Sequence, residues 1–580
     1  MSVERLITDN IDVWTSTVKT KSASGRGSSK KIELYGIKKL RELILELAVR
    51  GKLVPQDPTD EPASVLLERI AEEKAQLVKE KKIKKPKNLP EISDDEKVDK
   101  LPQGWIQARF GECFLISSGN SFKKDEELTE GEFIYCKVGD MNLAGNESSI
   151  TTSSSFIVPT DKQLKSLILS GSIIFPKRGG AIATNKKRFV RIPIFSDSNV
   201  MAVKPFYGVT LEFSMLWLNS IDLAALNTGT SVPQINNKDI EPLVFHFPPK
   251  KEQHRIVAKV DELMLLCDQL EQQTETSIEA HQTLVEVLLN TLTSSADAQE
   301  LMQNWQRISE HFDALFTTEK SIDTLKQTIL QLAIMGKLVP QDPNDEPAVK
   351  LLERIEEEKA QLIKDKKIKK QKALPEITED EKPFDLPSGW EWCRLPNLGE
   401  LARGKSKHRP RNDPKLYEGG SIPLVQTGDV ARANGTIHTY TAKYNEFGLS
   451  QSQLWPKGTL CITIAANIAD TATLGFDACF PDSVVGYTVY DKEIPTVYFD
   501  YFIKTAKENL ERFAPSTAQK NINLEILSNV LVPCPPKQQF SRIVEKVRTL
   551  FEICDNLKAC LSNSQTSQLR LTDTIIRKVV

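Results

Sequence analysis

The sequence predicts an α+β protein in which two β-rich domains are separated by long, coiled-coil-like helices, and in which the two halves form an internal repeat. Residues 51–105 recur at 336–390 without a gap, and 41 of the 55 positions are identical. A second pair of similar segments lies downstream, at 230–270 and 516–557. Each half therefore consists of two shared segments on either side of an insert that differs from its counterpart. Such a pattern predicts a duplicated helical frame that holds two different inserts.

Length and composition bound the class of protein. The chain has 580 residues, of which 27% are charged and 40% are hydrophobic, so it is long enough for several domains of ordinary composition. Its formal net charge is -2, so any surface for nucleic acid must be local. The N-terminal residues lack the apolar core of a signal peptide, and no apolar run is long enough to span a membrane. We expect a cytoplasmic protein without a membrane partner.

The spacing of cysteine and histidine gives no indication of a metal site. The nine cysteines form no CxxC pair, and the six histidines form no pair at ligand spacing. Scattered cysteines are typical of a reducing, intracellular compartment. No metal and no cofactor is therefore expected on this chain.

The first 35 residues are predicted to be a flexible arm. A weakly apolar start is followed by KTKSASGRGSSKK at 19–31, which has too few apolar residues to offset the entropy lost on ordering. Such a basic arm could contact DNA or a partner. The alternative is a plain disordered leader.

Residues 36–104 are predicted to form a first helical region. Leucines at helical spacing run from Leu40 to Leu47, and Gly51 then supplies a stop. A second helix ends in the cationic run KEKKIKKPK at 79–87, which recurs as KDKKIKKQK at 364–372. A cationic helix end beside each insert could contact phosphates. It could equally be a solvated terminus that the helix dipole favours.

Both inserts are predicted to consist of short strands and turns. Runs of β-branched and aromatic residues, such as FIYCKV at 133–138 and GTLCITI at 458–464, alternate with Gly, Asn and Ser. The pair Gly139-Asp140 stands in the first insert where Gly428-Asp429 stands in the second. The two inserts are therefore expected to share a fold and to differ in surface.

Each insert carries cations whose residue types suit DNA contact. Lysine and arginine hold phosphates, arginine and asparagine bind base edges, and nearby glycines let the backbone approach a ligand. A charged hairpin in water is the alternative interpretation. The candidates in the first insert are Lys123, Lys124, Lys177, Arg178, Asn185, Lys186, Lys187 and Arg188. The candidates in the second insert are Arg403, Lys405, Lys407, Arg409, Arg411, Lys415 and Arg432.

Long helices are predicted after each insert. One begins at Pro248-Pro249, where the missing N–H of proline costs least. Apolar residues then alternate at spacings of four and three from Ile256 to Leu288, and a similar seam runs from Ile543 to Leu561. We expect the long helices to pack antiparallel, which would relate the two halves by a pseudo-two-fold axis.

Two sequence patterns bear on catalysis, and neither predicts an active site. The segment GELARGKS at 399–406 matches the phosphate-binding pattern GxxxxGK[ST], but no apolar strand precedes it and Pro410 and Pro414 break any helix after it. The double prolines occur in FPPK and CPPK rather than in the [NDS]PP[YF] loop of a methyltransferase. The chain is therefore expected to be non-catalytic.

The repeated motifs resemble those of the specificity subunits of type I restriction-modification systems. LPxGW precedes each insert, TSVPQIN and STAQKNIN follow the first and the second, and a helix that opens with two prolines comes next. The blocks GKLVPQDP and EEKAQL resemble the type IB branch of that family. The resemblance covers nearly the whole chain after about residue 36.

The resemblance implies a division of the chain into six parts. These are a flexible arm (1–35), a first helical region (36–104), target recognition domain 1 (105–247), a central helical region and spacer (248–389), target recognition domain 2 (390–533) and a C-terminal helix (534–580). Each target recognition domain would bind one half of a bipartite, asymmetric site in double-stranded DNA.

The same resemblance implies that catalysis belongs to partners. This chain would direct two modification subunits, which methylate adenine with S-adenosylmethionine, and two restriction subunits, which translocate and cleave DNA with ATP and Mg2+. The other class open to the sequence is a helical scaffold whose inserts bind proteins rather than DNA. Affinity for duplex DNA that falls steeply with salt would distinguish the two.

Overall fold

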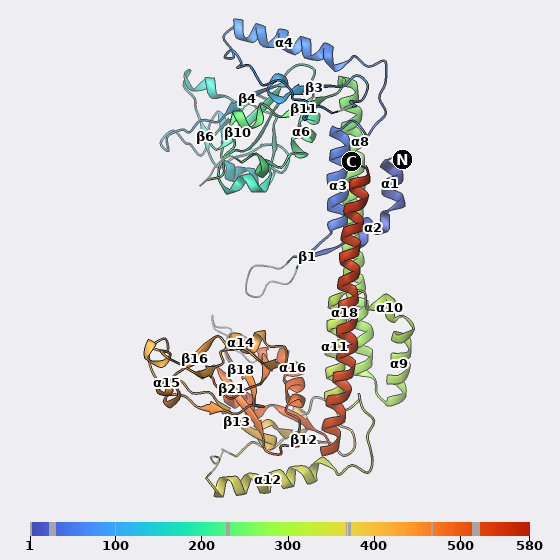
Figure 1. Ribbon diagram of the computed structural model, residues 1–580, viewed down its shortest axis with the longest axis vertical. Helices are drawn as coiled ribbons and strands as arrows, with labels where there is room; N and C mark the ends of the chain where they lie inside the picture. Colours follow the sequence, from blue (N-terminus) through green and yellow to red (C-terminus); the bar gives the residue numbers. More distant parts are fainter. Residues whose placement is uncertain are drawn as a thin grey trace. The chain divides into compact units, whose positions relative to one another are not determined.

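The computed structural model describes residues 3–21, 31–98, 100–227, 232–366, 368, 373–465, 468–512 and 522–579. The chain divides into two compact units, Met1–Ser277 with Gln565–Val580 (unit 1) and Ile278–Ser564 (unit 2). The two longest helices that the structure describes contribute to both units (Figure 1). Helix α8 (Lys250–Ser294) begins in unit 1 and ends in unit 2, whereas α18 (Lys537–Val579) begins in unit 2 and ends in unit 1. The predicted long helices are thus confirmed.

Unit 1 combines helices with short strands. Its further helices are α1 (Val3–Asp9), α2 (Ile11–Ser16), α3 (Tyr35–Val49), α4 (Ala63–Lys79), α5 (Phe110–Cys113), α6 (Leu211–Asn219) and α7 (Asn237–Ile240), with 3-10 turns η1 (Val138–Asn142), η2 (Gln163–Ser166), η3 (Gly180–Thr184) and η4 (Leu223–Leu226). Its strands are β1 (Lys19–Lys21), β2 (Lys31–Glu33), β3 (Ile106–Arg109), β4 (Phe114–Ser118), β5 (Phe133–Cys136), β6 (Phe156–Ile157), β7 (Ser172–Pro176), β8 (Arg188–Val190), β9 (Phe195–Ser196), β10 (Val200–Pro205) and β11 (Val244–Phe247).

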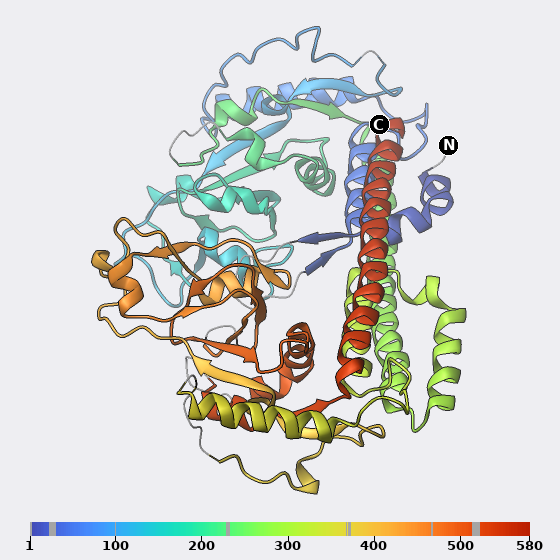
Figure 2. The same ribbon diagram turned by 60° about the horizontal axis from the view of Figure 1, so that its bottom comes forward.

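The structure corrects the expectation of a flexible arm over residues 1–35. Helices α1 and α2 order residues 3–16, and Trp14 on α2 is fully buried. The hydroxyls of Thr17 and Thr572 lie 3.1 Å apart. β1 pairs antiparallel with β2, as Figure 2 shows. Local composition did not predict this order because the anchor comes from the far end of the chain, while residues 22–30 of the predicted arm lie outside the described residues.

The insert of unit 1 is built on an antiparallel sheet of order β4-β10-β7-β8. Its apolar face includes Ile174, Val200 and Ala202, which are fully buried together with residues of β5. Helix α6 packs against the same sheet, and the Trp217 ring on α6 stacks on Phe110 with ring centroids 4.8 Å apart. The prediction of a β-rich insert is confirmed.

Unit 2 repeats this arrangement. Its further helices are α9 (Ala298–Glu310), α10 (Phe312–Leu315), α11 (Glu319–Ile334), α12 (Ala348–Lys364), α13 (Leu395–Leu398), α14 (Thr427–Arg432), α15 (Glu446–Ser450), α16 (Val497–Arg512) and α17 (Leu524–Asn529), with 3-10 turns η5 (Glu379–Glu381) and η6 (Pro414–Leu416). Its strands are β12 (Glu391–Arg394), β13 (Gly399–Arg403), β14 (Ile422–Leu424), β15 (Thr436–Ile437), β16 (Ala442–Tyr444), β17 (Leu454–Trp455), β18 (Leu460–Thr463), β19 (Thr471–Leu474), β20 (Ala478–Cys479), β21 (Val484–Val489) and β22 (Leu531–Cys534).

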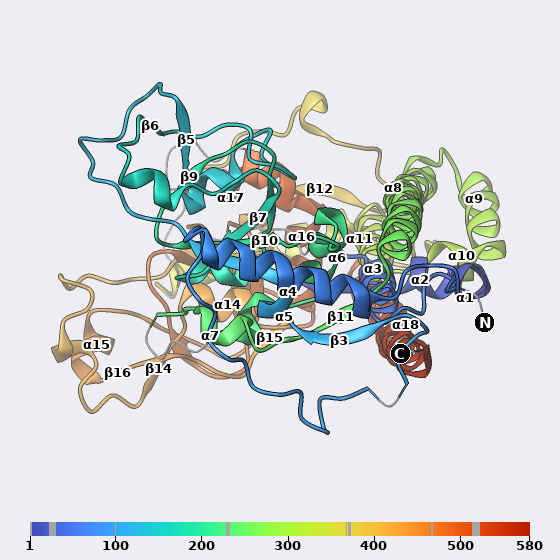
Figure 3. The same ribbon diagram turned by 90° about the horizontal axis from the view of Figure 1, so that it is seen from above.

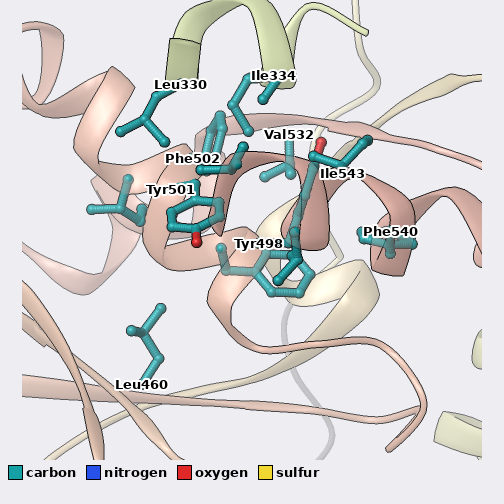
Figure 4. Close-up of a cluster of buried hydrophobic side chains, with 14 of the residues drawn as sticks. Leu330, Ile334, Leu460, Tyr498, Tyr501, Phe502, Val532, Phe540 and Ile543 are labelled. Atoms are coloured by element: carbon teal, nitrogen blue, oxygen red, sulfur yellow. The ribbon is translucent and has the colours of Figure 1, made fainter. Parts of the chain in front are cut away.

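A large apolar core joins the insert of unit 2 to its helices (Figure 4). Tyr498 on α16 is fully buried, its ring lies 4.7 Å from that of Phe540 on α18, and its hydroxyl donates to the Pro533 carbonyl at 2.7 Å. Leu330 and Ile334 bring α11 into the same core. This packing fixes the sheet of the insert on the helical frame.

The repeated frame segments hold each insert through a buried arginine. The Arg109 guanidinium donates to both carboxylate oxygens of Glu96, at 2.8 and 2.7 Å, and to the carbonyls of Pro90, Glu91 and Pro242. Arg394 makes the corresponding contact with Glu381 at 3.0 Å. Both arginines are buried, and each one ties the segment before LPxGW to the first strand of its insert.

Candidate nucleic-acid interface

The two inserts share a sheet order that places corresponding loops together. β4 and β7 both pair antiparallel with β10, so they run parallel to each other and end on either side of the first residues of β10. β13 and β18 stand in the same relation to β21. The loops 119–132 and 177–187 therefore leave the sheet of unit 1 at the same end of its strands. The loops 404–421 and 464–470 leave the sheet of unit 2 at the equivalent end. We call each of these the loop edge of its unit.

The Gly-Asp turns confirm that the inserts share a fold. Asp140 accepts a hydrogen bond from the Lys137 amide at 2.7 Å, and Asp429 accepts one from the Gln426 amide at 2.9 Å. Both carboxylates are buried and close a capping box directly after β5 or β14. The equivalence predicted from Gly139-Asp140 and Gly428-Asp429 holds in three dimensions.

A glycine starts the first loop at each loop edge. The Gly119 amide donates to Val200 at 3.1 Å, and the Gly404 amide donates to Val484 at 2.9 Å. A Cβ on Gly119 would lie 2.0 Å from the Asp197 carbonyl oxygen, and one on Gly404 would lie 2.3 Å from the Pro481 oxygen. The chain therefore passes too close to its neighbour for any side chain at these positions.

The second loop of unit 1 begins with an exposed arginine. Arg178 forms a β-bridge with Gln234, while the Lys177 carbonyl accepts from the Ile235 amide at 2.8 Å and the Gly179 amide donates to Pro233 at 2.8 Å. The Lys177 ammonium donates to the Ser118 hydroxyl at 2.8 Å, across the loop edge from the end of β4. Burial and the charge of Arg178 lower the pKa of Lys177.

Three further candidates, Asn185 and Lys186 in this loop and Arg188 at the start of β8, make internal contacts. Asn185 adopts a left-handed backbone with φ 52°, and its side-chain oxygen accepts from the Leu223 amide at 3.0 Å. The Lys186 ammonium donates to Asn142, and the Arg188 guanidinium donates to the Met141 carbonyl at 3.1 Å. These side chains therefore support the shape of the loop.

The structure removes Lys187 from the candidate DNA contacts. This residue is only 5% exposed, and its ammonium donates to Asn185 at 2.8 Å and to the Ile221 carbonyl at 3.0 Å. Burial lowers the pKa of Lys187 to about 8. A lysine held in the interior cannot reach a phosphate, so its role is structural. The sequence pattern could not show this because it counts charges without their depth.

The loop edge of unit 2 carries its cations on the first loop. The Arg403 guanidinium donates to the Asp482 carbonyl, and that of Arg411 pairs with the Asp482 carboxylate at 2.8 Å. The Arg409 guanidinium donates to the carbonyls of Ser406 and His408 at 2.5 and 2.8 Å. Arg403 at the end of β13 and the two arginines of the loop are thus held by their own domain.

The remaining candidates are exposed. Lys405, Lys407 and Lys415 lie on the first loop of unit 2, and Lys123 and Lys124 lie on the first loop of unit 1. Arg432 is 64% exposed, and its guanidinium pairs with the buried Asp429 at 2.5 Å. The structure brings the candidates of each unit to its loop edge, apart from Arg432, which follows the Gly-Asp turn.

The two cationic runs follow helices α4 and α12 and are separate in sequence from the loop edges. A hydrogen bond to the neighbouring insert holds each of these helices. In unit 1, the Lys74 ammonium on α4 donates to the Gly111 carbonyl on α5 at 3.0 Å, and Figure 3 shows α4 alongside α5. Lys359 on α12 makes the equivalent bond to Pro396 at 3.0 Å. In the run 79–87, the lysines are exposed. Most of the run 364–372 lies outside the described residues. Phosphate contact by these runs stays a prediction.

The match to a nucleotide-binding loop is accidental. Gly399–Arg403, the first part of GELARGKS, forms strand β13 rather than a loop. The residues after Ser406 turn through Pro410 to the short η6, so no helix follows to present its N-terminus to a phosphate. Within the described ranges, no cluster of three His, Cys, Asp or Glu side chains could hold a metal ion, and no helix is long and apolar enough to cross a bilayer.

Comparison with known proteins agrees with this architecture. The family model for the type I restriction modification DNA specificity domain matches residues 102–280 and 387–564, once in each half. The specificity subunits of the type I restriction enzymes EcoEI and EcoAI, both from Escherichia coli, are 38% and 39% identical, and each alignment covers 99% of both chains.

A solved structure of lower similarity also matches. The HsdS subunit from Thermoanaerobacter tengcongensis is 18% identical over 83% of this chain and 97% of that chain, with a TM-score of 0.41. The matches of both inserts to the family model, together with the full-length identity to two specificity subunits, show that this chain belongs to the specificity subunits of type I restriction enzymes.

Proposed function

We propose that each unit binds one half of a bipartite, asymmetric site in double-stranded DNA at its loop edge. The observation that carries this proposal is that exposed cations outside the acidic loop 119–132 lie at the same edge of the same sheet in both units, with Arg178 in unit 1 and Lys405, Lys407 and Lys415 in unit 2. Phosphate contacts of this kind supply most of the affinity of a protein for duplex DNA. The inserts differ in sequence, so the two half-sites differ.

The chain performs no chemistry itself and directs that of partners. The relatives are specificity subunits of restriction enzymes, which supports assembly with other subunits of such an enzyme. We propose two modification subunits and two restriction subunits as these partners, in the cytoplasm. S-adenosylmethionine, ATP and Mg2+ would bind those partners. Family membership favours this function over a scaffold whose inserts bind proteins.

The test is the salt dependence of DNA binding by the full chain. The logarithm of its affinity for a duplex of mixed sequence should fall linearly with the logarithm of salt concentration, with a slope of about 0.9 for each phosphate contacted. A map of methylated positions in genomic DNA exposed to the assembled complex should then show one two-part asymmetric sequence. Affinity that is independent of salt would contradict the proposal and favour the scaffold.

A further inference from the structure

The two loop edges obtain their positive charge from different loops. In unit 1 the first loop, 119–132, has two lysines against five acidic residues, whereas the second loop, 177–187, has four cations and no acid. In unit 2 the first loop, 404–421, has five lysines and arginines against two acids, whereas the second loop, 464–470, has no cation and one acid. The charges of corresponding loops are therefore exchanged between two domains of one fold.

The acidic first loop of unit 1 is fixed by its own carboxylates. Glu127 pairs with the Lys137 ammonium at 2.5 Å, and Glu126 accepts from the Lys123 amide at 2.7 Å and from the Gln163 side chain at 2.9 Å. Phosphates would be repelled by this loop at the distance of direct contact. DNA at the loop edge of unit 1 must therefore approach the second loop.

Within that second loop, Arg178 is the cation that is available to a ligand. It is exposed, and none of the described residues accepts a hydrogen bond from its guanidinium. Its backbone is held on both sides, by the Lys177 and Gly179 hydrogen bonds to the strand-like segment 233–235. The neighbouring Gly180 is exposed, and a Cβ there would meet nothing within 4 Å. An arginine on a fixed backbone beside open space suits bidentate hydrogen bonding to a guanine edge.

In unit 2 the situation is reversed, because the arginines are occupied and the lysines are available. Lys405, Lys407 and Lys415 are exposed, and none of the described residues accepts a hydrogen bond from their ammonium groups. Their backbones are fixed: the Lys405 carbonyl accepts from Ser452 at 2.9 Å, the Lys407 amide donates to Gln451 at 3.1 Å, and the Lys415 carbonyl accepts from Asn445 at 2.9 Å. Lysine ammonium groups act as point charges and suit phosphates rather than base edges.

We propose that the two half-sites are bound through different loops and in different ways. Unit 1 uses its second loop, with Arg178 as the side chain that discriminates a base. Unit 2 uses its first loop, with Lys405, Lys407 and Lys415 as contacts to successive phosphates. This inference rests on the proposed function, since it assumes that DNA lies at the loop edges.

The first experiment measures the salt slope of binding to a duplex of mixed sequence, using the full chain. Replacing Lys405, Lys407 and Lys415 by Ala should lower the slope by about 2 to 3 and weaken binding to all sequences alike. A matched control replaces Lys457 and Lys492, two exposed lysines. Lys457 precedes β18 and Lys492 follows β21, so both lie at the end of these strands that is opposite to the loop edge. This control should leave the slope unchanged, and so should replacement of Lys123 and Lys124 in the acidic loop.

The second experiment measures base discrimination with the assembled complex. Arg178→Lys keeps the charge but loses the bidentate geometry, so the salt slope should stay the same. The methylation map should then lose discrimination at one base pair of one half-site, by about 10- to 100-fold. The half-site of unit 2 should be unaffected.

The outcomes distinguish a failure of this inference from a failure of the proposed function. A wild-type chain without a salt slope would overturn the proposed function. A wild-type slope that the triple lysine variant retains, or that the Lys123 and Lys124 variant loses, would overturn the exchange of loops alone. A methylation map that Arg178→Lys leaves unchanged at every base pair would overturn the role of Arg178.

Discussion

Units 1 and 2 differ in the exposed loops at one end of the sheet and share several polar contacts in their interiors. The buried arginines, the capping Gly-Asp turns and the glycines that begin the first loops occupy equivalent places in both units. The loops that leave the same edge have exchanged charge. Buried polar contacts constrain a fold because each group needs its partner, whereas exposed loops tolerate change. The difference between the units is therefore expected to set which DNA each one binds.

The largest test of this comparison is the replacement of a whole insert. Residues 105–247 should be exchanged for the corresponding insert of the EcoAI relative, which leaves the frame of unit 1 in place. One half of the methylated target should change completely and the other half should stay the same, because the second insert is untouched. The measurement is a methylation map of genomic DNA. A target in which both halves change would show that the units do not act independently.

The second test removes the buried arginine from each frame. Arg109→Ala and Arg394→Ala should each lower the free energy of unfolding by about 2 kcal/mol, since each buried guanidinium donates hydrogen bonds to backbone carbonyls and a carboxylate that would lose this donor. The two losses should be similar because the contacts are similar. Urea unfolding measures them, with Arg69→Ala as control, where the ion pair with Glu61 is exposed and should contribute little.

The same contact predicts a dependence on acid. Hydrogen bonds from Arg109 and Ser93 lower the pKa of Glu96 to about 2, from an ordinary value of 4.5. The folded state thus binds fewer protons than the unfolded state between these values, so this contribution is complete above pH 4.5 and is lost as the pH falls towards 2. Arg109→Ala should flatten that part of the stability profile. An unchanged profile would show that Arg109 does not control Glu96.

The third test concerns a position where the units differ in their interior. Lys187 precedes β8 and is buried with a pKa of about 8, whereas Asp470, which precedes β19, pairs with Lys507 at 2.6 Å. Lys187→Met should raise the free energy of unfolding at neutral pH by about 2 kcal/mol, because a charged ammonium is costly there. DNA binding and its salt slope should not change.

The pH profile gives the sign of this effect. Between pH 8 and the ordinary lysine pKa of 10.5, the unfolded state binds more protons than the folded state. The stability of the wild-type chain should therefore rise with pH across this range, and the Met variant should lack the rise. A salt slope that falls in the Met variant would instead return Lys187 to the DNA contacts.

The sequence was sufficient for the repeat, the long helices and the β-rich inserts, because each depends on local pattern. The clusters of cations were also visible, and so was the equivalence of the Gly-Asp turns. Pattern could not show that Lys187 is buried or that the arginines from Arg403 to Arg411 are occupied by Asp482 and nearby carbonyls. Those facts depend on the depth and the neighbours of each side chain.

The sequence contains the charges of these loops, but it does not show which loops correspond or lie together, because that depends on how the strands pair. Only the pairing of β4 and β7 with β10 places the loops 119–132 and 177–187 at one edge. The sequence also did not predict that residues 3–21 form ordered structure, because the residues that hold them are distant in the chain. Their partners, Thr572 and its neighbours, are more than 500 residues away in the chain, and no local pattern contains them.

The smallest expected effect concerns one buried position at which the two frames carry different residues. Glu252 on α8 is fully buried and stands where Gln539 stands on α18. Burial raises the pKa of Glu252, and the Gln56 side chain donates a hydrogen bond to its carboxylate at 3.2 Å, while the buried Trp105 ring N–H finds no acceptor among the described residues. In unit 2 the ring N–H of Trp390, the counterpart of Trp105, donates to the Gln539 side-chain oxygen at 3.0 Å. A neutral amide therefore accepts the tryptophan hydrogen bond in the second frame.

Glu252→Gln should therefore make unit 1 more like unit 2 and raise the free energy of unfolding at pH 7 by about 1 kcal/mol. Because the folded state holds the proton of Glu252 more tightly than the unfolded state, wild-type stability should fall as the pH rises above 4.5, and the Gln variant should lose this fall. Gln539→Glu is the matched control and should destabilise unit 2. Urea unfolding between pH 4 and 8 measures both. If Glu252→Gln destabilises the chain instead, the carboxylate makes a contact in unit 1 that the frame of unit 2 does not need, and the two frames are less alike than their sequences.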